Sequence, residues 1–314
     1  MLLKKGAASK KELSFEMGLS QAALTISARP LIENGVIQIE GKKGNGKAGR
    51  KEEMLSLNPN YGYYLGCDIK ETSITVSTMD FAGHLTFEKK CRTGDEAILV
   101  IETLIKDGAP LGVGAIHRKS KASEKASEFI ARLSALPIPA PRKVNNVESL
   151  AAIYRFYHEE ATNFLLIKYG PGVGSCIYAN GAPILRSNGV KSEIGHAFLS
   201  DGRRLEDAVS FSSLLHEDIE EREGAELIYR DEKLLNAALQ GLALAIVDAD
   251  ALLALDKIVF AGILLSKEDI KEKIGKMVLA YDPSFDVSKI SIYPDYEEKN
   301  REKACLEVML EDYN

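Results

Sequence analysis

Cysteine is sparse in this chain, and long apolar runs are missing. The four cysteines (Cys67, Cys91, Cys176 and Cys305) include no Cys-x-x-Cys pair, which argues against a zinc knuckle or a redox motif. No segment approaches the ~18 consecutive apolar residues of a transmembrane helix. The first residues, MLLKKGAASKKE, carry no apolar run of signal-peptide length. We therefore expect a cytoplasmic protein with reduced thiols and with no metal, cofactor or membrane partner.

Acidic residues are scarce where the chain begins. Residues 1–51 hold ten Lys and Arg but only four Glu, a net charge of +6. The whole chain carries −6, so the remainder carries −12. A basic segment on an acidic body is typical of a protein that binds a polyanion with one part. The negative body would keep the rest of the protein away from DNA.

Residues 9–33 contain the local signals of two helices joined by a tight turn. Ser9 is a cap for a helix over residues 10–17, and Glu12 three residues later completes a capping box. Gly18 suits the left-handed residue that ends such a helix. Ser20 then caps the next helix. This order predicts a helix-turn-helix, whose second helix offers its N-terminal residues to the major groove of DNA.

The second helix is predicted to have one apolar face and one DNA-contacting end. Four residues at helical spacing form the apolar face: Leu24, Ala28, Leu31 and Ile32. The candidates for the DNA contact are Ser20, Gln21, Ala22, Ala23, Thr25 and Ile26. Gln pairs with adenine edges, and Ala and Thr methyl groups touch thymine methyls. Pro30 lies inside this helix, so we expect a bend or an early end there.

A basic hairpin follows. Residues 36–39 alternate like a strand, and a second strand is expected around residues 54–57. The glycine-rich segment between them supplies five cations for DNA phosphates, namely Lys42, Lys43, Lys47, Arg50 and Lys51. Helices and hairpin together predict a winged helix-turn-helix over residues 1–59. The alternative is a solvated hairpin on a helical domain that binds protein.

After Pro59 the pattern becomes that of an α/β body, residues 60–314, with lobes over about 60–160 and 161–314. Strands are expected at 63–69, 73–79, 111–116, 164–169, 175–178 and 257–260. Helices are expected near 97–106, 123–136, 212–220 and 234–255 and at the C-terminal end. Strands that alternate with helices favour α/β layers.

Two motifs in the body resemble the ROK family, which comprises repressors, open reading frames and sugar kinases. The run Ser187–His196 contains Glu-Ile-Gly-His and is similar to the sugar-site signature of the family, and Leu205-Glu206 is similar to its next sugar-contacting Glu. Leu31–Gly35 and the wing ending in Leu57-Asn58-Pro59 resemble the head of the transcriptional regulators in that family. The resemblance covers nearly the whole chain. It implies an actin-like, ribonuclease-H-like two-lobed ATPase fold behind a winged helix-turn-helix.

The motifs for kinase chemistry depart from the family. Its kinases carry Asp-x-Gly-Gly-Thr, whose glycines admit ATP phosphates, but here Lys70 and Glu71 replace both glycines. Val147 stands where the resemblance places the catalytic Asp, and a valine side chain accepts no proton. Pro171 replaces Thr in the second phosphate loop, and Ala261-Gly262 replaces Gly-Gly. We therefore expect no kinase activity.

The remaining site residues fit a sugar better than a metal. The cysteines that join the histidine in the zinc site of the family are absent after His196, and one histidine does not hold a structural zinc. The resemblance assigns sugar contacts to Asn146, Glu193, His196 and Glu206. The open alternative is that these residues only bond locally and that His196 is a core histidine.

The sequence thus predicts a DNA-binding transcriptional regulator, a repressor of sugar-utilisation genes, with an inert kinase-like body. This body either senses a sugar or sugar phosphate or serves only for association, and it forms homodimers or higher homo-oligomers. Two alternatives stay open: an active ROK-family sugar kinase with an N-terminal appendage, and a scaffold whose winged helix binds protein.

Overall fold

The computed structural model describes residues 1–43, 52–70, 72–117, 123–144, 146–185 and 193–312. The chain forms two compact units. The first comprises Met1–Asn145 together with Glu302–Asn314, and the second comprises Asn146–Arg301.

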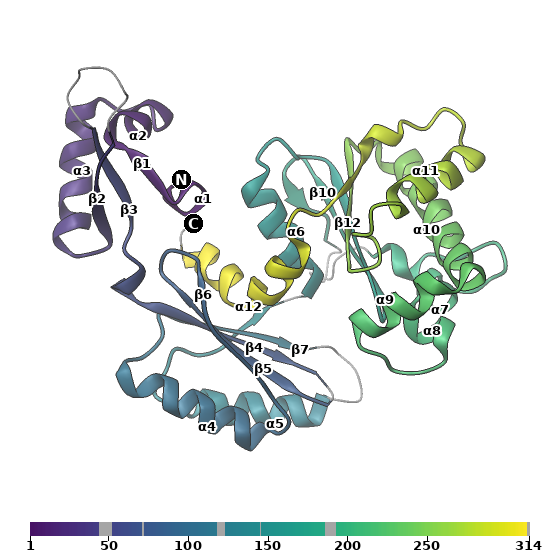
Figure 1. Ribbon diagram of the computed structural model, residues 1–314, viewed down its shortest axis with the longest axis horizontal. Coiled ribbons are helices and arrows are strands. Elements are labelled where there is room, and N and C mark those ends of the chain that lie inside the picture. The colour runs from purple at the N-terminus through teal and green to yellow at the C-terminus, as the bar shows by residue number, and fades with distance from the viewer. Residues whose placement is uncertain (44–51, 71, 118–122, 145, 186–192, 313–314) are drawn as a thin grey trace. The chain divides into compact units, whose positions relative to one another are not determined.

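The described part of the first 57 residues forms three helices and a small antiparallel sheet of order β1-β3-β2 (Figure 1). The elements are α1 (Leu2–Lys5), β1 (Ala7–Ser9), α2 (Lys10–Glu16), α3 (Gln21–Glu33), β2 (Ile37–Lys43) and β3 (Glu52–Leu57). The predicted capping box is confirmed, since the Glu12 N–H donates to Ser9 Oγ and the Ser9 N–H donates to Glu12 Oε2. Gly18 has φ 63°, as the left-handed helix stop requires.

The structure corrects two expectations for α3. Of the two outcomes expected at Pro30, a bend or an early end, the early end is wrong, because the helix continues to Glu33. Pro30 lies in the last turn, where its missing N–H removes only one hydrogen bond. Leu24, Ala28 and Ile32 pack into the small core as predicted, but Leu31 lies outside that core and is 41% exposed.

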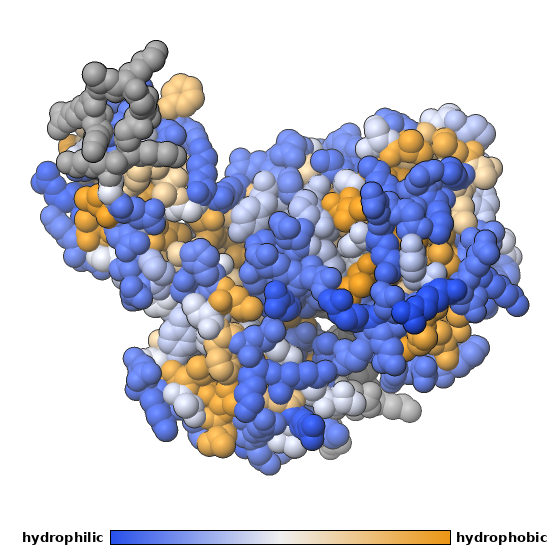
Figure 2. Space-filling model, viewed as in Figure 1, coloured by the Kyte–Doolittle hydropathy of each residue, from blue (hydrophilic) through white to orange (hydrophobic). Residues whose placement is uncertain are grey.

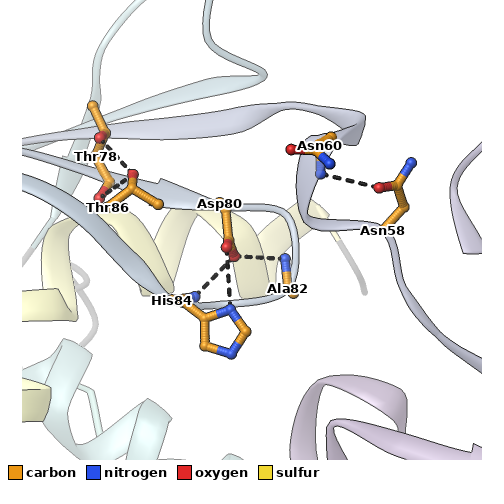
Figure 3. Close-up of polar contacts among 7 residues, drawn as sticks. All are labelled: Asn58, Asn60, Thr78, Asp80, Ala82, His84 and Thr86. Carbon is orange, nitrogen blue, oxygen red and sulfur yellow. Dashed lines mark hydrogen bonds and ion pairs between the residues drawn. The ribbon is translucent and has the colours of Figure 1, made fainter. Parts of the chain in front are cut away.

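Short polar turns organise the chain where this segment meets the next sheet. The Asn58 amide donates to the Gly35 carbonyl (2.7 Å), and its Oδ1 accepts from the Asn60 N–H (3.1 Å). In the next hairpin, Asp80 Oδ1 accepts the N–H groups of Ala82 and His84 at 2.9 and 3.0 Å (Figure 3). These hydrogen bonds hold both turns, and the rings of Tyr61 and Phe81 in the two turns pack at 4.8 Å between centroids.

The larger sheet of the first unit has the order β6-β5-β4-β7-β8. Its strands are β4 (Tyr63–Ile69), β5 (Ile74–Asp80), β6 (Leu85–Cys91), β7 (Gly112–His117) and β8 (Arg142–Val144). The helices α4 (Gly94–Leu104) and α5 (Ser123–Ser134) cover one face, and the end of α12 (Tyr296–Asp312) covers the other (Figure 1). Gly66 and Gly114 allow α12 to approach closely, because a Cβ at either position would collide with Ala304.

The second unit is a five-stranded sheet of order β11-β10-β9-β12-β13 with its own helices. The strands are β9 (Phe164–Tyr169), β10 (Val173–Ala179), β11 (Ala182–Pro183), β12 (Lys257–Ala261) and β13 (Ile290–Ile292). The helices are α6 (Asn146–Tyr157), α7 (Leu205–Val209), α8 (Phe211–Leu215), α9 (Glu221–Arg230), α10 (Glu232–Leu253) and α11 (Ile270–Tyr281).

One prediction in this unit is wrong. The helix expected at 212–220 ends at Leu215, because His216 adopts a left-handed conformation with φ 58°.

Helix α10 lies in the main core of this unit. It is the one described helix that is long and apolar enough to cross a membrane, with a mean hydropathy of 1.3. Its Leu239, Leu242 and Ile246 side chains are nevertheless buried against the sheet and its neighbouring helices, as in the central helix of a globular core. On the face shown in Figure 2, hydrophilic residues cover most of the surface, and hydrophobic residues gather in separate patches.

Candidate functional site

The candidate site is built around the turn between β9 and β10, residues 170–174. The Gly170 N–H donates to the Gly172 carbonyl (3.0 Å), and the Gly170 carbonyl accepts from the Phe211 N–H (3.0 Å). A Cβ at Gly172 or Gly174 would stand 2.5 Å from a neighbouring side-chain atom, so that neighbour would have to shift. The two glycines therefore favour the close approach of other groups to the backbone of this turn.

Glu206 is one of these groups. It lies in the first turn of α7, and its Oε1 accepts the Val173 N–H at 3.3 Å. A Cβ at Gly172 would stand 2.5 Å from the same oxygen. A carboxylate accepts up to about four hydrogen bonds, so Glu206 keeps capacity for a hydroxyl ligand.

Glu193 precedes the short 3₁₀ helix η3 (Ile194–His196) and His196 is its last residue; η3 packs on the start of β10. The Ile194 N–H donates to the buried Ser175 Oγ at 2.7 Å, and a Cβ at Gly195 would collide with the Val173 carbonyl. Glu193 Oε2 lies 3.6 Å from His196 Nε2, and His196 is exposed. His196 is thus not a core histidine. Glu193, His196 and Glu206 all come from segments that contact the first residues of β10.

Val147 packs against the same turn. It follows Asn146 at the start of α6 and is 5% exposed. A Cβ at Gly174 would approach Val147 Cγ2 to 2.5 Å, so the valine fills the space beside this glycine. The Asn146 side chain lies outside the described residues, as does Glu71, so their predicted roles stay predictions.

A buried ion pair that the sequence did not predict lies next to the same turn. Lys168 Nζ in β9 lies 3.1 Å from Glu221 Oε2 at the start of α9. Glu221 Oε1 also accepts from the Tyr296 hydroxyl (2.7 Å) and the Ile263 N–H (3.1 Å). The only sequence signal is a lysine inside the apolar strand Phe164–Tyr169, because a buried lysine requires an acidic partner.

The environment of Glu221 shifts its titration. Burial of the carboxyl raises its pKa, but the attraction of Lys168 and the hydrogen bonds from Tyr296, Lys168 and Ile263 outweigh that effect. The net result is a pKa below the usual value for Glu. Glu221 is therefore ionised at neutral pH between the 170–174 turn and the Gly262 loop.

In the first unit, Asp68 at the end of β4 faces a buried lysine. Lys303 Nζ in α12 lies 3.8 Å from Asp68 Oδ2, and the Lys303 side chain is almost fully buried. Asp68 is the acid of the segment that replaces the kinase Asp-x-Gly-Gly-Thr motif. Its carboxylate is engaged by a cation of the protein itself.

The candidates for the DNA contact on α3 are accessible. Gln21, Ala22, Thr25 and Ile26 are exposed, and Ala23 is partly exposed. Ser20 Oγ accepts the Ala23 N–H at 3.1 Å, and the Thr25 hydroxyl donates to the Gln21 carbonyl at 2.8 Å. Thr25 therefore presents its methyl group. Lys42 and Lys43 lie in β2 but their side chains are outside the described residues, and so are Lys47, Arg50 and Lys51 entirely.

No protein-family model matches the sequence, and no curated protein matches it. Solved structures do. A ROK-family transcriptional regulator, a homologue of the Escherichia coli Mlc protein, superposes with a TM-score of 0.65 at 16% identity, over 96% of this chain and 92% of that one. A ROK-family protein from Streptococcus pneumoniae in complex with sucrose superposes with a TM-score of 0.63 at 13% identity, over 80% of this chain and 99% of that one. The ROK hexokinase of Thermus thermophilus superposes with a TM-score of 0.58 at 14% identity, over 80% of this chain and 100% of that one.

At these identities the likeness shows the fold. The chain has the mixed α/β fold of ROK-family proteins, a fold that includes both sugar kinases and a transcriptional regulator.

Proposed function

We propose that this protein is a DNA-binding transcriptional regulator, a cytoplasmic repressor of sugar-utilisation genes, with a catalytically inert kinase-like body. The observation that carries the proposal is the extent of the structural likeness. The regulator matches 96% of this chain, whereas the hexokinase matches 80% although its own chain is covered completely. The fifth of this chain that the hexokinase does not match is about as long as the segment before β4.

The architecture of that segment supports DNA binding. Helices α2 and α3, joined by a short turn and followed by the hairpin β2–β3, have the order of elements expected for a winged helix-turn-helix, which supports the proposed head. The exposed Gln21 and Thr25 occupy the N-terminal end of the recognition helix α3. Such regulators bind paired half-sites as homodimers, because the symmetry of the protein matches that of the operator.

Three arrangements in the body support the loss of kinase activity. Val147 fills the space beside Gly174, where a catalytic carboxylate is expected by resemblance. Glu221 Oε1 accepts the hydrogen bond of the Ile263 N–H next to the Gly262 loop, and its negative charge would repel a phosphate there. Asp68 is paired with Lys303.

The body keeps groups for a sugar effector. Glu193, His196 and Glu206 surround the start of β10 and offer donors and acceptors to hydroxyl groups, and Asn146 is proposed to complete the set. Binding of a sugar or sugar phosphate would shift the population of body conformations and thereby the operator affinity.

The test is binding of the full chain to DNA upstream of its own gene, measured by fluorescence anisotropy at two salt concentrations with and without a sugar panel. We expect tight binding that weakens steeply with salt, because cations of the protein displace counterions from phosphates. Gln21→Ala should cost about 1–3 kcal/mol on the operator, whereas Lys271→Gln on α11 should change nothing. Absence of binding would contradict the regulator. Sugar-dependent ATP turnover would revive the kinase, and salt-independent capture of a protein would favour the scaffold.

A further inference from the structure

A cavity of about 260 Å³ lies in the first unit, and none of its lining residues belongs to the candidate sugar site. Three elements enclose it, namely the β4–β5 hairpin, the N-terminus of α4 and one side of α5. Figure 1 shows α4 and α5 on the same face of the first large sheet.

Basic residues outnumber acidic residues in the lining of the cavity, which therefore has a net positive charge. The basic residues are Lys70, Arg92, Lys125 and Arg132, and the acidic residues are Asp95 and Glu128. Arg132 is paired with Asp95 at 2.7 Å. Within the described part of the chain, Arg92 and Lys125 form no ion pair through their side chains, so both remain available to a ligand.

The N-terminus of α4 adds backbone donors. Thr93 caps this helix of 11 residues, and its Oγ1 accepts the Glu96 N–H at 3.2 Å. The N–H groups of Gly94 and Asp95, in the first turn, have no acceptor within the helix, and both residues line the cavity. A helix start of this kind favours anions through its dipole.

A second and independent observation points to a ligand. Ser73 lines the cavity, is 5% exposed, and its Oγ has no hydrogen-bond partner among the described residues. A buried hydroxyl without a partner is unfavourable, and an acceptor oxygen in the cavity would satisfy it.

We propose that this cavity binds a phosphate monoester of a small metabolite. Arg92, Lys125 and the start of α4 hold the phosphate, and Ser73 donates to one of its oxygens. The volume is slightly below that of pockets for drug-sized ligands, which suits a phosphate on a short carbon skeleton. The proposal does not depend on DNA binding or on the sugar site.

Isothermal titration calorimetry on the full chain tests it with inorganic phosphate, glycerol 3-phosphate and glycerol. We expect both phosphates to bind, glycerol 3-phosphate more tightly, and glycerol to give no heat. Arg92→Gln and Lys125→Gln should each weaken binding about tenfold, as expected for loss of a charged hydrogen bond. Ser73→Ala should weaken it less.

Lys106→Gln is the matched control, since it removes an exposed cation of the same unit that does not line the cavity. Circular dichroism melting checks that each variant is folded. No binding of either phosphate, or equal affinity in Arg92→Gln, Lys125→Gln and Lys106→Gln, overturns the proposal. Binding of inorganic phosphate without any gain for glycerol 3-phosphate overturns the monoester and leaves a free-anion site.

Discussion

Lys168 Nζ lies 3.1 Å from Glu221 Oε2, and the two side chains are only 7% and 16% exposed. Removal of one partner leaves a buried charge without compensation, which costs about 3 kcal/mol or more. We therefore expect Lys168→Met to lower the free energy of unfolding by that amount in urea titrations. Glu272→Gln, which breaks an exposed pair on α11, should cost less than about 0.5 kcal/mol. Equal effects of the two variants would contradict the structural role of Lys168.

The same pair makes stability depend on pH. Because the folded-state pKa of Glu221 lies below its usual value, the ionised form stabilises the fold at neutral pH. This contribution is complete above the unfolded pKa of about 4.3 and is lost as pH falls through the lower folded pKa. Urea unfolding from pH 7 down to pH 3 should show a steeper loss in the wild type than in Glu221→Gln. Parallel curves would refute the assignment.

Restoring an acid at position 147 should not restore catalysis. Val147→Asp buries a carboxylate beside Gly174, so we expect a destabilisation of about 2 kcal/mol or more. Val147→Asn is the uncharged control of similar shape and should be less destabilising at pH 7. Coupled ADP-release assays with a hexose panel should stay at background for both. Sugar-dependent turnover in Val147→Asp would mean that the rest of the kinase machinery is intact.

The contact between Val147 and Gly174 also predicts a non-additive pair. Gly174→Ala places a methyl group 2.5 Å from Val147 Cγ2 and should cost about 1–3 kcal/mol. In a Val147→Ala background that cost should shrink by about 1 kcal/mol, because the space is already vacated. A double-mutant cycle of unfolding free energies measures this coupling, and strict additivity would contradict the packing.

Ser20 allows stability and DNA affinity to be separated. Ser20→Ala removes the cap of α3 and should cost about 1 kcal/mol of stability. Ser20→Asp keeps a capping oxygen and hence the stability, but places a negative charge where the DNA phosphates are expected. Thermal melting should therefore detect the loss of stability in Ser20→Ala, and operator binding should detect the loss of affinity in Ser20→Asp. Unchanged operator affinity in Ser20→Asp would place the DNA elsewhere.

The four thiols should be unreactive in the folded protein. Cys67, Cys91, Cys176 and Cys305 are buried, and none of them forms a disulfide. Burial raises the pKa of Cys305 to about 12 and that of Cys67 further. Since the thiolate is the nucleophile, we expect no labelling by Ellman's reagent at pH 8 and four labelled thiols in urea. Fast labelling of the native protein would show that these cores open readily.

The sequence predicted best where the determinants are local. The bounds of α2 and the start of α3 depend on Ser9, Glu12, Gly18 and Ser20, which act within a few residues. Strand β9 was found because it begins with four consecutive apolar residues, 164–167. The early end at Pro30 failed, because one missing hydrogen bond in a last turn does not outweigh the packing of Ile32.

Long-range contacts account for what was missed. The motif positions Glu193, His196 and Glu206 were found by resemblance, and the structure brings them to the start of β10. The Lys168–Glu221 pair joins residues 53 positions apart. The cavity of the first unit combines residues from three separate stretches, such as Ser73, Arg92 and Lys125. Neither arrangement has a pattern at helix or strand spacing, so only the folded chain reveals it.

The close approach of α12 to Gly66 and Gly114 affects how the protein folds during synthesis. Cys305, Val308 and Met309 are buried, and Val308 would collide with a Cβ at Gly112. Residues 1–145 therefore leave the ribosome long before the segment that completes their core, although domains usually fold in order of synthesis. A nascent chain halted before residue 302 would expose the glycine-lined face of its first large sheet. Chaperones could bind this surface until α12 has been synthesised.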